Sequence, residues 1–99
     1  MVVFVKNYID GDTAVSYEDG KKCYKDVIEA LNKGENVVLN FEGIEYVITA
    51  FLNPIIGDLI LEKGLEVMKN IEIIQANKKT IDKIKLVKEG ALLKREDME

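Results

Sequence analysis

Residues 35–51 read ENVVLNFEGIEYVITAF, and this stretch decides the fold. Residues 37–41 form a short apolar run between turn signals, which is typical of an interior strand. Gly43 predicts a turn or bulge, and residues 44–48 can continue as extended chain. The apolar residues take up helical spacing from Phe51 onward. We therefore predict a buried strand, a turn, an extended segment and a central helix.

The sequence before this stretch predicts a strand followed by a helix. Residues 2–8 are mainly β-branched and aromatic, as in a strand. Ser16 is a good N-cap, and the apolar residues after it recur at steps of three and four up to Gly34. Gly20 interrupts this helix at a cost of about 1 kcal/mol relative to alanine. We expect this glycine to let the helix approach the sheet closely.

The central helix is predicted over residues 51–61, where two apolar rows at i, i+4 indicate a helix that is buried or borders an interface. Its start is ambiguous, because Thr49 and Asn53 are both candidate N-caps. Pro54 is best tolerated in the first turn. A start between residues 50 and 53 would avoid losing a backbone hydrogen bond at the proline.

The remaining sequence predicts one more strand and one more helix. Residues 71–76 have the composition of a strand, and Asn77 can cap a last helix that ends near Gly90. Residues 94–99 are highly charged, so we expect a frayed tail after a single domain of residues 1–93. The alternation of strands and helices predicts an α/β fold with a largely parallel sheet.

The composition is that of one globular domain, with 99 residues of which 47% are hydrophobic and 32% charged. Cys23 is the single cysteine, so an internal disulfide is excluded and we expect a reducing, cytoplasmic setting. We expect no membrane span and no signal peptide, because no apolar segment approaches about 20 residues. The net charge of −4 argues against binding to nucleic acid.

The residue types needed for most catalytic chemistry are missing. Without histidine the chain lacks the commonest general base and metal ligand, and it has no glycine-rich phosphate loop. Cys23 lies on the apolar face of the first predicted helix, which indicates a core thiol. We interpret Glu42, Glu45 and the lysines of residues 78–88 as solvated side chains. We therefore expect no enzyme activity, no metal and no cofactor.

The junction at Thr49 and Ala50 is the best-placed candidate site. A residue where a strand turns into a helix lies at the C-terminal edge of a sheet, where open α/β folds generally place ligands. A hydroxyl there meets free backbone N–H groups, which also favour a phosphate. The alternative, which we favour, is that Thr49 only caps the central helix.

Three features carry a resemblance to a known family: Ser16 at a helix start, the stretch ENVVLNFEGIEYVITAF followed by Gly57, and IEIIQANKKTIDKI at residues 71–84. The span from Ser16 to Ile84 resembles the STAS-like domain of unknown function of small bacterial and phage proteins. More distantly, it is similar to the STAS domains of anti-sigma-factor antagonists. The resemblance implies an STAS-like sandwich with a mixed, mostly parallel four-stranded sheet and helices mainly on one face.

The same resemblance implies a regulatory surface at the start of the central helix. In the antagonists an ATPase-type protein kinase phosphorylates a serine there, which adds about −1.5 to −2 charges and switches partner binding. Ala50 takes the position of that serine in this chain, with Thr49 beside it, and Asn40 replaces an aspartate of the preceding strand. The first departure removes a hydroxyl group and the second removes a charge, so the resemblance supports the fold better than a phospho-switch.

The resemblance leads us to expect a non-enzymatic module that binds a partner protein through Thr49, Ala50, Asn53 and Asp58. One alternative is a phospho-switch at Thr49 that is controlled by a histidine-kinase-type ATPase. Another alternative is a small-ligand or nucleotide site at the edge of the sheet. An apolar central helix could also serve a homodimer.

Overall fold

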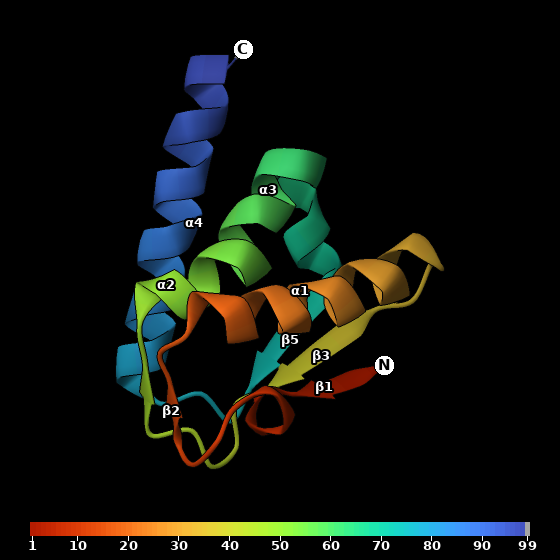
Figure 1. Ribbon diagram of the computed structural model, residues 1–99. Coiled ribbons are helices and arrows are strands. Elements are labelled where there is room, and N and C mark those ends of the chain that lie inside the picture. The colour runs from red at the N-terminus through yellow and green to blue at the C-terminus, as the bar shows by residue number, and fades with distance from the viewer. Residues whose placement is uncertain (99) are drawn as a thin grey trace.

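Three parallel strands form the main sheet in the order β1-β3-β5 (Figure 1). The computed structural model describes the backbone of residues 1–98 and the side chains of residues 1–96. The strands are β1 Val2–Phe4, β3 Val37–Asn40 and β5 Ile71–Ile74. Val3, Leu39 and Ile73 lie side by side across the sheet. The parallel order agrees with the alternation of strands and helices in the sequence.

The extended segment after Gly43 does not join this sheet. β2 (Thr13–Ala14) and β4 (Tyr46–Val47) pair in a separate two-stranded parallel ladder. Gly43 adopts a φ of 78°, and the turn that contains it leads the chain away from the sheet before β4 begins. The prediction of one mixed four-stranded sheet is therefore wrong, since the described strands form a sheet of three and a ladder of two, both parallel.

The first strand is shorter than the sequence predicts. After Phe4 the chain enters a 3-10 helix, η1 (Val5–Tyr8), so the prediction of a strand over residues 2–8 holds only at its start. Val5 is fully buried there, and the Tyr8 hydroxyl donates a hydrogen bond to the Asp26 carboxylate. These tertiary contacts outweigh the extended preference of a β-branched and aromatic segment.

The first helix, α1 (Tyr17–Asn32), begins as predicted, because the Ser16 Oγ accepts a hydrogen bond from the Asp19 N–H at 3.2 Å. Gly20 allows a close approach, but to the central helix and not to the sheet. A Cβ at this position would lie 2.3 Å from the Phe51 carbonyl oxygen and 2.8 Å from the Pro54 ring. Only glycine fits there without moving one of the two helices.

The central helix runs from residue 49 to residue 63 in three parts: α2 (Thr49–Leu52), the π-turn η2 (Asn53–Gly57) and α3 (Asp58–Lys63). Its N-cap is Ile48, with no side-chain cap, so the predictions of Thr49 or Asn53 as the cap are wrong. Pro54 lies inside the helix instead of in its first turn. The wider π-turn accommodates it, with the Asp58 N–H donating to the Asn53 carbonyl.

A short 3-10 helix, η3 (Leu65–Asn70), leads to β5, and α4 (Lys78–Met98) completes the chain. Asn77 caps α4 as predicted, since its Oδ1 accepts from the Thr80 N–H at 2.9 Å. The prediction that this helix ends near Gly90 is wrong. Residues 94–98, which we expected in a frayed tail, belong to α4, and Glu99 lies outside the described residues.

Arg95 explains part of this extension. Its Nη1 donates to the Leu61 carbonyl at 2.6 Å and lies 3.4 Å from the Ile60 carbonyl, at the end of α3. Carbonyls in the last turn of a helix lack intrahelical donors, and a cation there is favoured by the helix dipole. The arginine therefore ties the last part of α4 to the central helix.

The core lies between the sheet and the helices, which cover one face of the sheet (Figure 1). Val3 and Leu39 point into the core, whereas Val2 and Phe4 on the opposite face are 51% and 43% exposed. Six large apolar side chains of the central helix have no exposed area: Phe51, Leu52, Ile55, Ile56, Leu59 and Ile60. This apolar face is therefore core and not an interface. Within residues 1–98, no helix is long and apolar enough to cross a membrane.

Candidate functional site

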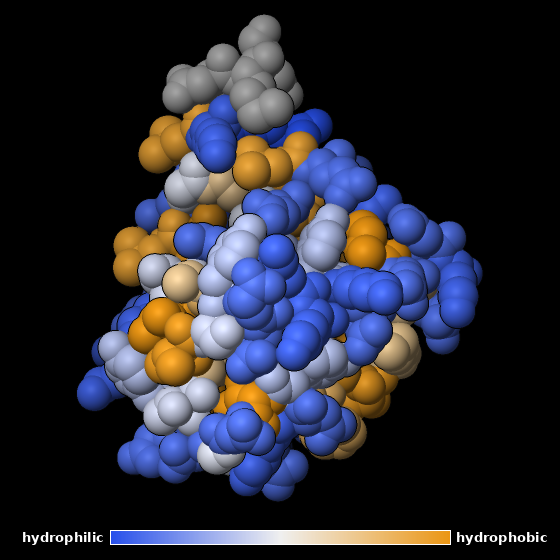
Figure 2. Space-filling model, viewed as in Figure 1, coloured by the Kyte–Doolittle hydropathy of each residue, from blue (hydrophilic) through white to orange (hydrophobic). Residues whose placement is uncertain are grey.

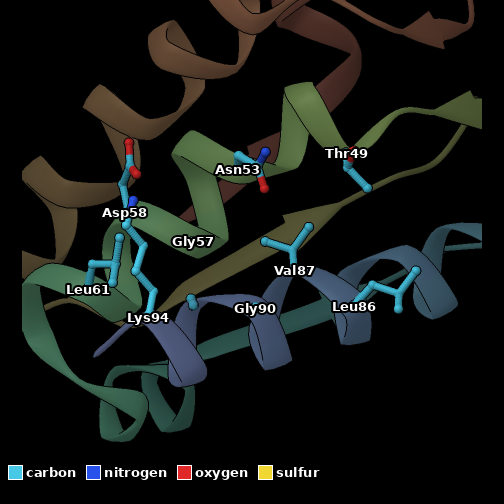
Figure 3. A pocket seen from close by; sticks show the side chains of 10 residues that line it. Thr49, Asn53, Gly57, Asp58, Leu61, Leu86, Val87, Gly90 and Lys94 are labelled. Carbon is cyan, nitrogen blue, oxygen red and sulfur yellow. The ribbon is translucent and has the colours of Figure 1, made fainter. Parts of the chain in front are cut away.

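An open groove of about 430 Å³ separates the central helix from α4 (Figure 3). The wall on the central helix carries Thr49, Asn53, Gly57, Asp58 and Leu61. The wall on α4 carries Leu86, Val87, Gly90, Ala91 and Lys94. The first wall is largely polar, and the second is apolar with a single cation at one end. Three of the four site residues predicted from the sequence lie together on the first wall.

Helical spacing places these residues on one wall. Thr49, Asn53, Gly57 and Leu61 are four residues apart, and residues at this spacing form a row along a helix. Gly57 forms part of the floor, where a Cβ would lie 3.5 Å from Val87. Figure 3 shows the Asn53 amide facing α4 across the groove.

Thr49 is exposed at the first residue of the central helix. The Phe51 N–H donates to the Ile48 carbonyl, so the first turn is closed by the backbone and not by the Thr49 hydroxyl. This hydroxyl forms no hydrogen bond with any described residue. It therefore remains available to solvent or to a binding partner.

Asn53 and Asp58 are also exposed, and neither side chain forms a hydrogen bond or ion pair within the described part of the chain. Asp58 also affects α1. Burial first, then a hydrogen bond to Glu62, and then the charges of Glu62 and Asp58 raise the pKa of Tyr24 to about 12. The phenol of Tyr24 thus stays protonated at the side of the central helix that faces α1.

Ala50, the fourth predicted residue, is half-buried and does not line the groove. Neighbouring residues on a helix point about 100° apart, so Ala50 and Thr49 face different surroundings. A side chain at position 50 and one at position 49 would not present a phosphate in the same place. The structure therefore separates the two residues that the sequence placed together.

The α4 wall was not predicted from the sequence. The Leu86 side chain on this wall is 61% exposed. Lys94 was assigned to the tail, whereas it extends from α4 toward the wall that carries Asp58 (Figure 3). No pattern near residues 49–58 points to these positions, of which the nearest, Leu86, lies 28 residues after Asp58.

Lys83 fixes one end of the groove. Its Nζ donates to the Val47 carbonyl at 2.6 Å and lies 3.9 Å from the centre of the Tyr46 ring. A cation over an aromatic face is attracted by the electrons of the ring. These two contacts connect α4 to β4, directly before the first residue of the central helix.

The other candidates from the sequence lie outside this groove. Burial raises the pKa of the Cys23 thiol to about 12, with a further contribution from the charge of Asp26, so the reactive thiolate is disfavoured. Glu42 and Glu45 are exposed near the turn after β3. Among the described residues, no group of three acidic or cysteine side chains is arranged to hold a metal ion.

A comparison with protein families places the chain. The family model of the STAS-like domain of unknown function (DUF4325) matches residues 19–80, which include the central helix, β3 and β5. No curated protein and no solved structure matches the sequence or the fold. Because the matched span covers more than half of the chain, this protein belongs to the family of STAS-like domains of unknown function.

Proposed function

We propose that this chain is a non-enzymatic regulatory module that binds a partner protein in the groove between the central helix and α4. One observation carries the proposal. Thr49, Asn53 and Asp58 present polar groups on one wall that form no hydrogen bond or ion pair with the described residues. They lie opposite the exposed apolar surface of α4. Protein interfaces combine an apolar centre with hydrogen-bonding groups around it, and this groove has both.

The position of the groove supports the proposal. Its polar wall is the first half of the central helix, and the backbone there is fixed by the contact with Gly20 and by Lys83 at the end of β4. A fixed surface loses little conformational freedom when a partner binds. The resemblance to anti-sigma-factor antagonists points to the same part of the domain.

The test is a pair of substitutions on the polar wall. Asn53→Arg places a bulky side chain in the groove. Asp58→Lys reverses the charge that this wall presents to a bound partner. Each should weaken partner binding by at least about tenfold, or about 1.4 kcal/mol. The partner is first captured from cells with the wild-type chain, and binding is then measured by calorimetry with the two purified proteins. A histidine-kinase-type ATPase is the first candidate to test.

Matched controls lie away from the groove. Asn70→Arg and Glu29→Lys make the same changes at exposed positions in η3 and α1. They should leave the affinity unchanged. Equal affinity for the wild type and both groove variants, with unchanged circular dichroism spectra, would rule out this surface as the binding site.

A second candidate is a phospho-switch at Thr49, favoured by the exposed and unused hydroxyl at a helix start. A phosphate there would lie at the positive end of the helix dipole, which favours an anion. The chain is incubated with the ATPase and ATP, and its intact mass is measured. One added phosphate that is lost in Thr49→Ala and kept in Thr13→Ala, an exposed threonine in β2, supports the switch. An unchanged mass in the wild type removes it.

A further inference from the structure

Gly90 has no explanation inside the folded chain. It lies within the 21 residues of α4, its surface is exposed, and a Cβ at this position would meet nothing within 4 Å. A glycine in a helix interior costs about 1 kcal/mol relative to alanine. The close packing that requires Gly20 is absent here, so nothing in the described chain compensates for this cost.

The two most exposed apolar side chains among the described residues of α4 flank this glycine. Leu86 is 61% exposed and Leu93 is 64% exposed, four residues before and three residues after Gly90. Residues at these spacings share one face of a helix. Figure 2 shows apolar surface along the edge of the molecule formed by α4. The glycine is therefore a gap in an exposed apolar face.

The charges on the same face follow an order. Asp82, Leu86, Gly90 and Lys94 are spaced four residues apart and form one ridge of α4. Neither Asp82 nor Lys94 forms an ion pair with a described side chain. Along the helix the ridge thus presents an acid, a leucine, a gap at the glycine and a base. It is roughly 18 Å long at 1.5 Å per residue.

This order is self-complementary. A twofold axis can pass through the midpoint of the ridge, which lies at the height of residue 88 along the helix. This axis maps the ridge onto a second copy that runs in the opposite direction. Asp82 then meets Lys94 of the second copy, and Leu86 meets the gap at Gly90. The same contacts repeat on the other side of the axis, as in every isologous interface. Packing of two such four-residue ridges is the commonest class of helix contact, at a crossing angle near −50°.

We propose that a second copy of this chain covers this face, with two α4 helices packed antiparallel around Gly90. Leu86 fills the gap left by Gly90 of the other copy, Leu93 flanks that contact, and Asp82 pairs with Lys94 at both ends. One proposal thereby accounts for the unexplained glycine, the exposed leucines and the unpaired charges. A contact of one helix face is smaller than a standard interface, so the dimer is weak and forms at micromolar or higher concentrations.

Leu86, Gly90 and Lys94 also line the α4 wall of the groove, so a second copy on this face would compete there with the partner proposed above. The dimer is tested with the chain alone, and a failure to dimerise therefore leaves the proposed partner binding standing. Sedimentation velocity is measured from about 10 µM to about 1 mM. The wild type should shift from monomer to dimer across this range. Gly90→Leu fills the gap and should remain monomeric. Asp82→Lys and Lys94→Asp should each raise the dissociation constant at least about tenfold, because each change places two like-charged pairs in the interface.

The double variant Asp82→Lys/Lys94→Asp gives the sharpest result, since it restores opposite charges and should return the dissociation constant to within about threefold of the wild type. Ile81→Lys is the matched control, because Ile81 is 40% exposed on another side of α4 and should not affect the dimer. Circular dichroism confirms folding of each variant. A wild type that stays monomeric to the highest concentration, or a dimer that is insensitive to the charge changes, would overturn the proposal.

Discussion

Alanine at Gly20 should destabilise the fold although it favours the helix. The added Cβ would lie 2.3 Å from the Phe51 carbonyl oxygen and 2.8 Å from the Pro54 ring, so α1 and the central helix must separate. Overpacking of this kind costs typically 1–3 kcal/mol, and contact with a backbone atom places this site at about 3 kcal/mol. The higher helix propensity of alanine offsets about 1 kcal/mol of this cost. The net loss of unfolding free energy is about 2 kcal/mol, or roughly 8–16 °C in Tm at this chain length.

The same substitution at Gly90 is the control. A Cβ there meets nothing within 4 Å, so Gly90→Ala should raise the unfolding free energy by about 0.5–1 kcal/mol. Both variants are measured by urea denaturation and thermal melting at low protein concentration, where the chain is monomeric. Opposite signs at the two glycines support the packing argument. A Gly20→Ala variant as stable as the wild type would refute it, because the two helices would then not be in the contact described.

Three further predictions concern Cys23, Arg95 and the binding of nucleotides. The folded state raises the pKa of Cys23 from 9.0 to about 12, so the folded chain holds the thiol proton more tightly than the unfolded chain does. The contribution of this thiol to the unfolding free energy is therefore complete below about pH 9 and is lost as the pH rises toward 12. Urea denaturation at increasing pH should show this loss, and Cys23→Ala should delay its onset to about pH 10, where tyrosines begin to ionise. Arg95→Ala should lower the unfolding free energy by about 1.5–3 kcal/mol because it leaves the Leu61 carbonyl without its charged donor, whereas Lys94→Ala should have little effect. A panel of nucleotides should give no thermal shift, although a bound ligand at 100 times its Kd would add about 2.7 kcal/mol.

Local signals identified most elements of the fold. The Ser16 cap, the helical spacing after it and the apolar run of β3 each depend on neighbouring residues, and the structure confirms all three. The Asn77 cap was predictable for the same reason. A pattern that is read over a few residues succeeds where local geometry decides the outcome.

The errors occur where distant contacts decide. Gly90 resembles a helix end, but Arg95 continues α4 by binding the end of α3. Pro54 resembles a helix start, but a π-turn admits it because Gly20 and the core fix the helix on both sides of it. Neither compensation can be read from the residues around the proline or the glycine.

The candidate site was likewise predictable only in part. Thr49, Asn53 and Asp58 were predicted because the family resemblance points to the start of the central helix, where all three lie. Their opposite wall comes from α4, and only the packed structure brings the two walls together. The sequence therefore predicted half of the groove and could not predict its shape.

The two-stranded ladder has a consequence for local unfolding. β2 ends shortly before α1 begins, and β4 ends shortly before the central helix begins, so both helices start from the same four paired residues. Two further backbone bonds flank these pairs, from the Ile48 N–H to the Ala14 carbonyl and from the Glu45 N–H to the Asp12 carbonyl. So small a ladder should open at a low free energy and release the first turns of both helices together. In native-state hydrogen exchange these amides should therefore exchange as one unit, at a lower free energy than the amides of the main sheet.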